Sequence, residues 1–175
     1  MEKTAIRKFK WFWAWQDEAE EAWLGKMSQE GWHLSSFRLP GIYSFTAGGP
    51  RDYVYRLDFR IQPKKDMEDY LQPFRDAGWE YVGEMSSWHY FRKEVRPGEV
   101  TEIFTDVESK VKKYKRLLIY LVIFLPIWSV LVGNVLSSHP YVWWSIVQMA
   151  VFLLLLLYVF VVFRILLRIG QLKRH

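Results

Sequence analysis

The hydrophobic positions of this chain follow two different patterns, and the longer one lies near the C-terminal end. From residue 117 to residue 163, 47 consecutive positions carry no Asp, Glu, Lys or Arg, although the chain as a whole is 25% charged. A bilayer core about 30 Å thick needs roughly 20 apolar residues of helix. The run is therefore too long for one span and sufficient for two. We predict transmembrane helices over residues 117–136 and 142–163, joined by an external turn over residues 137–141.

Before that run, the pattern has the short period of β-strands. Apolar and polar side chains alternate over residues 53–61, as expected of a strand with one apolar face. Residues 9–15 alternate in the same way and predict a second strand. Gly48 and Gly49 indicate a loop between strands, and a Ser86–Ser87 pair indicates a tight turn.

Two helices are predicted in the same region. The first is expected to begin near Glu18, because Asp17 and Glu20 have the spacing of a capping box. The second contains Pro73, which cannot donate a backbone hydrogen bond. We expect this helix to begin late, near Asp69, so that the proline falls in its first turn.

A repeat organises these elements into one fold. A shift of 47 residues aligns identical residues without a gap: Phe12 with Phe59, Glu21 with Glu68, Leu24 with Leu71, Gly31 with Gly78, Trp32 with Trp79 and Tyr43 with Tyr90. Each copy reads strand, helix, Gly-Trp, strand, strand. We predict an α+β protein: a duplicated βαββ two-layer soluble domain over residues 1–96, followed by the two-helix transmembrane hairpin. The repeats cover about residues 8–48 and 53–94, with six to eight short strands and both helices packed on one face.

The connector over residues 97–116 is predicted to be a linker followed by an amphipathic, basic juxtamembrane helix. Thr105 and Glu108 have capping-box spacing, and an apolar stripe continues from there into the first span. A continuous helix could transmit movement between the domain and the bilayer, or it could be a passive stalk. The sequence leaves both open.

Positive charge is concentrated at the two ends of the hairpin. Residues 1–109 hold 15 Lys and Arg against 19 Asp and Glu, so the overall net charge of +5 comes from residues 110–116 and the basic tail at 164–175. The positive-inside rule then predicts a multi-pass protein of the plasma membrane with both termini in the cytoplasm. Because the domain itself is acidic, we expect no nucleic-acid binding. The residues expected to contact lipid headgroups are Lys110, Lys112, Lys113, Lys115, Arg116, Arg164 and Arg168.

Candidate catalytic chemistry is sparse. The chain has no cysteine, and its four histidines do not have the spacing of metal ligands. No nucleophile-elbow, P-loop or dinucleotide-binding motif is present in the sequence. We therefore predict no catalytic residue, no metal and no cofactor. Glu18, Glu20 and Glu21 are interpreted as acidic residues that favour the start of a helix.

Aromatic side chains are the better evidence for a binding surface. The chain contains 10 Trp and 10 Tyr, most of them before residue 100. Most must pack in the core, but the number exceeds what one small core needs, and some are expected to line a groove for an apolar or cationic small ligand. The predicted ligand-binding residues are Trp32, Tyr43, Tyr53, Tyr55, Arg56, Trp79 and Trp88. For Arg56, a solvated ion pair with Asp58 is the competing interpretation.

Several short motifs along the domain also carry a family resemblance. They are Glu21-x-Trp23-Leu24-x-x-Met27, Gly31-Trp32-x-Leu34, Tyr53-x-Tyr55-Arg56, Trp88-x-Tyr90-Phe91-Arg92-Lys93 and Phe104-x-Asp106-x-x-Ser109. Over roughly residues 8–116 the chain resembles the domain of unknown function 2812 family. The resemblance implies a bacterial, membrane-anchored protein, often encoded beside PadR-type regulators, and implies no activity. Pro73 departs from the family pattern.

Three classes of function follow from these observations. The first is a membrane-anchored cytoplasmic interaction or ligand-sensing module, regulatory and not an enzyme. The second is a structural or accessory subunit of a larger membrane complex, with a protein partner or a homo-oligomer as its context. Gln148 and Asn134, two polar residues in the predicted spans, favour it. The third is an enzyme that acts on lipids at the cytoplasmic face, which only the predicted location supports.

Overall fold

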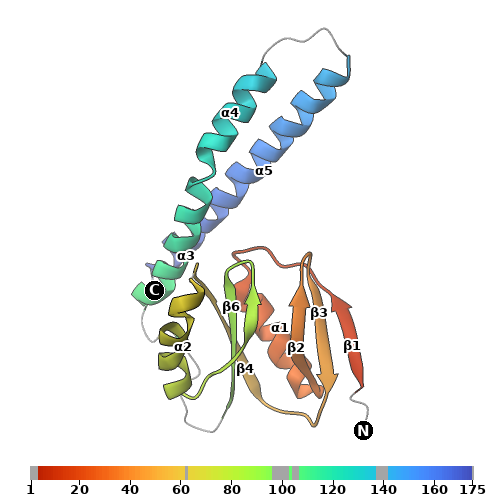
Figure 1. The fold of residues 1–175 in the computed structure, drawn as a ribbon, viewed down its shortest axis with the longest axis vertical. Helices are drawn as coiled ribbons and strands as arrows, with labels where there is room; N and C mark the ends of the chain where they lie inside the picture. The colour runs from red at the N-terminus through yellow and green to blue at the C-terminus, as the bar shows by residue number, and fades with distance from the viewer. Residues whose placement is uncertain (1–3, 62, 96–102, 104–106, 137–141, 175) are drawn as a thin grey trace. The chain divides into compact units, whose positions relative to one another are not determined.

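The computed structural model describes residues 4–61, 63–95, 103, 107–136 and 142–174. The chain divides into two compact units, Met1–Asp106 and Val107–His175, called unit 1 and unit 2 below and described separately. The elements of unit 1 are β1 (Ala5–Phe9), α1 (Asp17–Gln29), β2 (Trp32–Arg38), β3 (Ile42–Ala47), β4 (Tyr53–Phe59), the 3₁₀ turn η1 (Lys64–Asp66), α2 (Met67–Asp76), β5 (Glu80–Met85) and β6 (Trp88–Glu94) (Figure 1).

Unit 1 consists of two antiparallel three-stranded sheets of identical topology. Their strand orders are β1-β3-β2 and β4-β6-β5, so each repeat forms one sheet and contributes one helix. A register shift between Leu34 and Ser36 in the first sheet recurs between Tyr81 and Gly83 in the second, 47 residues further on. The predicted α+β class and the duplication are therefore confirmed. The Ser86–Ser87 turn is also confirmed, since both residues have the positive φ that a two-residue hairpin turn requires.

Helices α1 and α2 belong to different hydrophobic clusters, because they contact opposite faces of the second sheet. Neighbouring residues of a strand point to opposite faces. In β6, Tyr90 packs into the cluster around α1, whereas Phe91 packs into the cluster around α2. The expectation that both helices cover one face is therefore wrong. The core around α1 unites both repeats and consists of Leu24, Met27, Leu34, Tyr43, Phe45, Tyr55, Leu57 and Tyr90.

Helix α1 also covers the free edge of β4, which pairs with β6 only on its other side. Glu21 Oε1 accepts a hydrogen bond from the Leu57 backbone N–H at 2.8 Å, and Ser28 Oγ lies 3.0 Å from the Tyr55 hydroxyl. Gly25 permits the close approach, since a Cβ there would lie 3.2 Å from the Tyr53 carbonyl oxygen. An uncovered edge strand is a template for aggregation, so this helix protects the domain as well as filling its core.

Three local predictions are wrong for identifiable reasons. The first strand ends at Phe9, and residues 10–16 form a loop in which the indoles of Trp13 and Trp15 stack. Helix α1 begins at Asp17 without a side-chain cap, so the expected capping box is absent there. Helix α2 begins at Met67, which leaves Pro73 inside the helix rather than in its first turn. The carbonyl that Pro73 cannot satisfy belongs to Asp69, which is an exposed residue.

The part of unit 2 that the structure describes contains three helices: α3 (Val107–Val122), α4 (Leu125–Leu136) and α5 (Val142–Leu172). Among the described residues, two stretches are long and apolar enough by length and composition to cross a membrane, Lys110–Asn134 and Trp143–Leu172. Helix α5 packs against both α3 and α4. The predicted tail at 164–175 is helical as far as Leu172, and the predicted external turn at 137–141 lies outside the described residues, as do Thr105 and its expected cap.

The first apolar stretch is broken where the sequence suggested a continuous helix. Pro126 cannot donate a hydrogen bond to the carbonyl of Val122, and helix α3 ends at Val122. Close to the break, the Tyr158 hydroxyl of α5 donates a hydrogen bond to the Leu121 carbonyl oxygen at 2.9 Å, and its ring lies 5.6 Å from that of Trp128. The Tyr158 side chain of α5 therefore supplies a hydrogen-bond donor to the backbone beside the break between α3 and α4.

Candidate functional site

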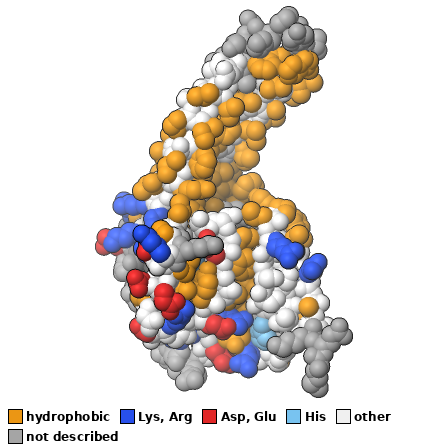
Figure 2. All heavy atoms as spheres, in the orientation of Figure 1, with side chains coloured by type: hydrophobic (Ala, Val, Ile, Leu, Met, Phe, Trp, Pro, Cys, Tyr) orange, Lys and Arg blue, Asp and Glu red, His pale blue; other side chains and the backbone are white. Residues whose placement is uncertain are grey.

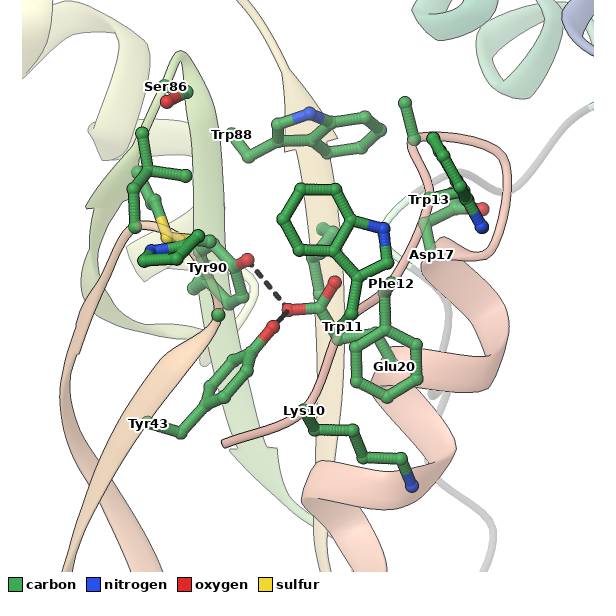
Figure 3. Close-up of a pocket in the computed structure, with 16 residues that line it drawn as sticks. Lys10, Trp11, Phe12, Trp13, Asp17, Glu20, Tyr43, Ser86, Trp88 and Tyr90 are labelled. Atoms are coloured by element: carbon green, nitrogen blue, oxygen red, sulfur yellow. Dashed lines mark hydrogen bonds between the residues drawn. The ribbon is translucent and has the colours of Figure 1, made fainter. Parts of the chain in front are cut away.

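A cavity of about 180 Å³ lies at one end of unit 1, where both repeats meet (Figure 3). Its walls come from the loop after β1, the start of α1, the β2–β3 turn, and strands β3, β4 and β6 with the β5–β6 turn. The lining residues are Lys10, Trp11, Phe12, Trp13, Ala14, Asp17, Glu20, Leu39, Pro40, Gly41, Tyr43, Leu57, Met85, Ser86, Trp88 and Tyr90. The lining is mostly apolar and aromatic, with two carboxylates.

Glu20 is the central polar group of this cavity. The side chain is 6% exposed, and its Oε1 accepts hydrogen bonds from the hydroxyls of Tyr43 and Tyr90, both at 2.7 Å. The two tyrosines are equivalent residues of the two repeats, whereas the counterpart of Glu20 in the second repeat is Met67. Two symmetry-related hydroxyls thus converge on one carboxylate oxygen that only the first repeat supplies. Figure 3 shows Trp11 and Trp88 around the same cavity.

The groups around Glu20 shift its pKa in opposite directions. Burial raises the pKa of Glu20, and the hydrogen bonds from Tyr43 and Tyr90 lower it in part, because they stabilise the charged form. Nearby Asp17 raises the pKa further by charge repulsion. The pKa values of Tyr43 and Tyr90 are raised by burial and by Glu20, so both phenols stay protonated and act as donors. The net result is a carboxyl group that titrates above the usual range of glutamate.

A dependence of stability on pH follows from that raised pKa. Above pH 4.5, the ordinary pKa of the group, the unfolded chain releases the Glu20 proton while the folded chain still holds it. The contribution of Glu20 to stability is therefore expected to fall as the pH rises from that value through the folded pKa. Thermal unfolding of wild type and Glu20→Gln between pH 4 and pH 8 checks this. The glutamine variant is expected to gain melting temperature relative to wild type as the pH rises, and a constant difference would contradict the assignment.

The rim of the cavity is aromatic and carries one cation. Lys10 Nζ lies 4.8 Å from the centroid of the Trp23 ring and 5.2 Å from that of Phe12. The rings of Trp11 and Trp13 meet edge to face at 5.8 Å. The face of an aromatic ring attracts positive charge, as the position of the Lys10 ammonium over Phe12 and Trp23 illustrates.

The comparisons with known proteins match one family. The model of the family described as "Protein of unknown function (DUF2812)" matches residues 16–125, well over half of the chain. The chain belongs to the DUF2812 family. No match to this chain was found among the curated proteins or the solved structures. Glu20, Tyr43 and Tyr90 lie within the matched segment of this DUF2812 chain, and the loop at residues 10–15 lies before it.

The predicted ligand-binding residues of this DUF2812 chain occupy different places. Tyr43 and Trp88 line the cavity. Tyr53 lines a second, more open depression of about 440 Å³, where Arg92 forms an ion pair with Glu80. The other residues lie mainly within the packing: Trp32 against the core around α1, Tyr55 within that core, Trp79 in the core around α2 and Arg56 beside Glu21 at 3.3 Å. The Asp58 carboxylate accepts a hydrogen bond from the Tyr70 hydroxyl at 3.0 Å.

Sequence reasoning missed Glu20 as a site residue. Among the glutamates at the start of α1, Glu18 is exposed, but Glu20 and Glu21 are buried. A signal was present, because two tyrosines repeated at a core position need an acceptor for their hydroxyls. Among the described residues, no group of three or more His, Asp or Glu side chains is arranged to hold a metal ion.

The predicted headgroup contacts lie on the helices of unit 2. Lys112 is exposed and pairs with Glu108 at 3.0 Å, and Lys115 and Arg164 are also exposed. Lys113 is buried, and its ammonium lies 5.3 Å from the centroid of the Tyr114 ring. Arg168 Nε lies 3.4 Å from the Tyr114 hydroxyl. Several of these cations therefore also contribute to packing within the unit.

Proposed function

We propose that this DUF2812 chain is a membrane-anchored, non-catalytic sensing module whose cavity binds a small organic cation. The observation that carries the proposal is the Glu20 carboxylate, held by Tyr43 and Tyr90 inside a cavity with an aromatic rim. Ring faces and a partly desolvated carboxylate both favour a cation over a neutral molecule of the same shape. The volume of about 180 Å³ is below the roughly 300–1,000 Å³ typical of drug-sized pockets, so the ligand is compact.

The remaining parts of the proposal concern location. The two apolar stretches of unit 2 anchor the chain as a multi-pass protein of the plasma membrane. Both termini face the cytoplasm, in keeping with the basic residues at the ends of the hairpin. Unit 1 then samples cytoplasmic solutes next to the bilayer. Ligand binding changes the packing between the two repeats, because both contribute to the cavity.

Benzyltrimethylammonium is a suitable probe, because its charge does not change with pH. We expect it to raise the melting temperature of the full chain in detergent, and benzyl alcohol to have a smaller effect at equal concentration. Glu20→Gln keeps an oxygen that accepts both hydroxyls but removes the charge. It is expected to weaken binding of the cation about tenfold, equivalent to roughly 1.4 kcal/mol, and to leave binding of the alcohol unchanged.

The pH dependence gives an independent check on the same site. Only the ionised carboxylate attracts a cation, so affinity for benzyltrimethylammonium is expected to rise with pH through the raised pKa of Glu20. Isothermal titration calorimetry at several pH values measures it. Equal affinities for the cation in wild type and Glu20→Gln, at every pH, would refute the proposed ligand class.

A further inference from the structure

The end of unit 1 that carries the cavity also exposes an unusual group of apolar side chains. Phe9 is 68% exposed, Leu39 65%, Trp11 52% and Trp13 37%. These four residues are called the aromatic tip below. Figure 1 places the end of β1, the loop after it and the β2–β3 turn at the same end of the unit. The Lys10 backbone N–H donates a hydrogen bond to the Gly41 carbonyl at 2.9 Å and so joins that loop to that turn.

Basic residues lie along the strands and loops of the first repeat, whereas its acidic residues lie in or directly after α1, whose Asp17 lines the cavity beside the tip. Residues 4–16 and 31–51 contain five basic residues and no Asp or Glu, although residues 1–109 as a whole have more acidic than basic residues. Lys10 stands between Phe9 and Trp11, and Arg38 directly precedes Leu39. Both cations are exposed. Figure 2 shows hydrophobic side chains gathered at this end of the unit, with Lys and Arg side chains nearby.

Exposed aromatic residues interleaved with cations match the interface of a lipid bilayer. Indole rings settle at the level of the headgroups, and Lys and Arg nearby are attracted by anionic lipid. A contiguous exposed apolar surface of this kind marks a site of interaction. The same chain supplies two stretches long enough to cross a bilayer, so a membrane lies within reach of unit 1 through the connector before Val107. Tethering makes even a weak contact effective, because the second binding event becomes intramolecular.

We propose that the aromatic tip docks into the headgroup region of an anionic bilayer, with Lys10 and Arg38 facing the lipid phosphates. This contact is separate from the apolar helices of unit 2. Because Trp11, Trp13 and Leu39 also line the cavity, docking places the cavity rim at the membrane surface. The docking does not depend on the nature of the cavity ligand, and its test is independent of the test for cation binding.

The absence of cysteine in the sequence makes a site-specific test simple. Leu39→Cys places one thiol at the tip, and Gln72→Cys places a control thiol on the exposed surface of α2. Each full-length variant is labelled with a nitrobenzoxadiazole fluorophore and reconstituted in nanodiscs that contain doxyl-labelled lipid. One set of discs contains phosphatidylcholine alone, and the other also contains phosphatidylglycerol. We expect quenching at the tip in the anionic discs, less in the neutral discs, and none at position 72 in either.

Neutralising the two cations tests the electrostatic part of the contact. Lys10→Gln with Arg38→Gln is expected to lower the docked-to-free ratio about 30-fold, which abolishes most of the quenching at the tip. Lys10→Gln also removes the ammonium from the faces of Trp23 and Phe12, so a cooperative thermal transition of the double variant is the measure that its fold is intact. Three results overturn the proposal: equal quenching at positions 39 and 72, quenching that is insensitive to anionic lipid, and a buried fluorophore that lipid does not quench. The last result, with crosslinks between copies, assigns the tip to a protein interface instead.

Discussion

Replacing Glu20 by leucine is expected to destabilise residues 1–106 by about 3 kcal/mol, because two buried hydroxyls lose their acceptor at roughly 1–3 kcal/mol each. Tyr43 and Tyr90 are 2% and 1% exposed, so both side chains are almost entirely removed from bulk water in the folded state. Some of this cost is offset, since the variant no longer buries a carboxylate. Urea unfolding at pH 7, followed by tryptophan fluorescence, measures the change. Glu20→Gln serves as the matched control and is expected to leave the stability unchanged or to raise it.

A mutant cycle separates this explanation from a simple packing defect. In wild type, Tyr43→Phe and Tyr90→Phe each remove a hydrogen bond to a buried carboxylate and are expected to cost about 1.5–3 kcal/mol. In the Glu20→Leu background the same substitutions remove a hydroxyl that has lost its acceptor, so they are expected to be neutral or stabilising. Equal costs in both backgrounds would show that the hydroxyls do not depend on Glu20.

The duplication was predictable from sequence because it rests on backbone geometry that few residues satisfy. Gly31 and Gly78 have φ of +85° and +81°, a region that other residues rarely adopt. Equivalent register shifts follow each of them. These features recur at a spacing of 47 residues, so an alignment of the sequence with itself at that shift reveals them. The apolar stretches of unit 2 were predictable for a similar reason, since uncharged length is visible without any tertiary information.

Tyr43 and Trp88 were predicted as site residues, but Glu20 was missed because its role depends on how the two copies differ. Glu20 corresponds to Met67, so no repeated signal marks it. Glu21 accepts a backbone hydrogen bond from β4, whereas its repeat partner Glu68 is exposed and pairs with Arg75. These differences let α1 pack between the repeats, and the sequence period alone could not show it. The loop at residues 10–16 misled the strand prediction for another reason. Its alternating aromatic side chains serve the cavity rim and the surface instead of one face of a sheet.

The repeat glycines supply a second large effect, because their surroundings differ although their backbones agree. A Cβ on Gly31 would lie 2.8 Å from the Gly48 carbonyl oxygen, whereas a Cβ on Gly78 would meet only the flexible end of Lys93, at 3.4 Å. Both alanine variants incur the left-handed penalty of about 1–2 kcal/mol. Gly31→Ala must also move a backbone segment whose position is fixed, since the Gly48 N–H donates a hydrogen bond to the Gly31 carbonyl at 2.9 Å.

We therefore expect Gly31→Ala to cost about 4 kcal/mol in urea unfolding of residues 1–106, and Gly78→Ala about 1–2 kcal/mol. Gly49→Ala is the control for the same loop, because a Cβ there meets nothing within 4 Å. Its effect is expected to stay within about 0.5 kcal/mol. Equal losses of stability for Gly31→Ala and Gly78→Ala would mean that the loop after β3 can move away from the new Cβ at no cost in free energy. In that case the contact between Gly31 and Gly48 would not hold the first repeat in shape, and only the shared backbone conformation would account for both glycines.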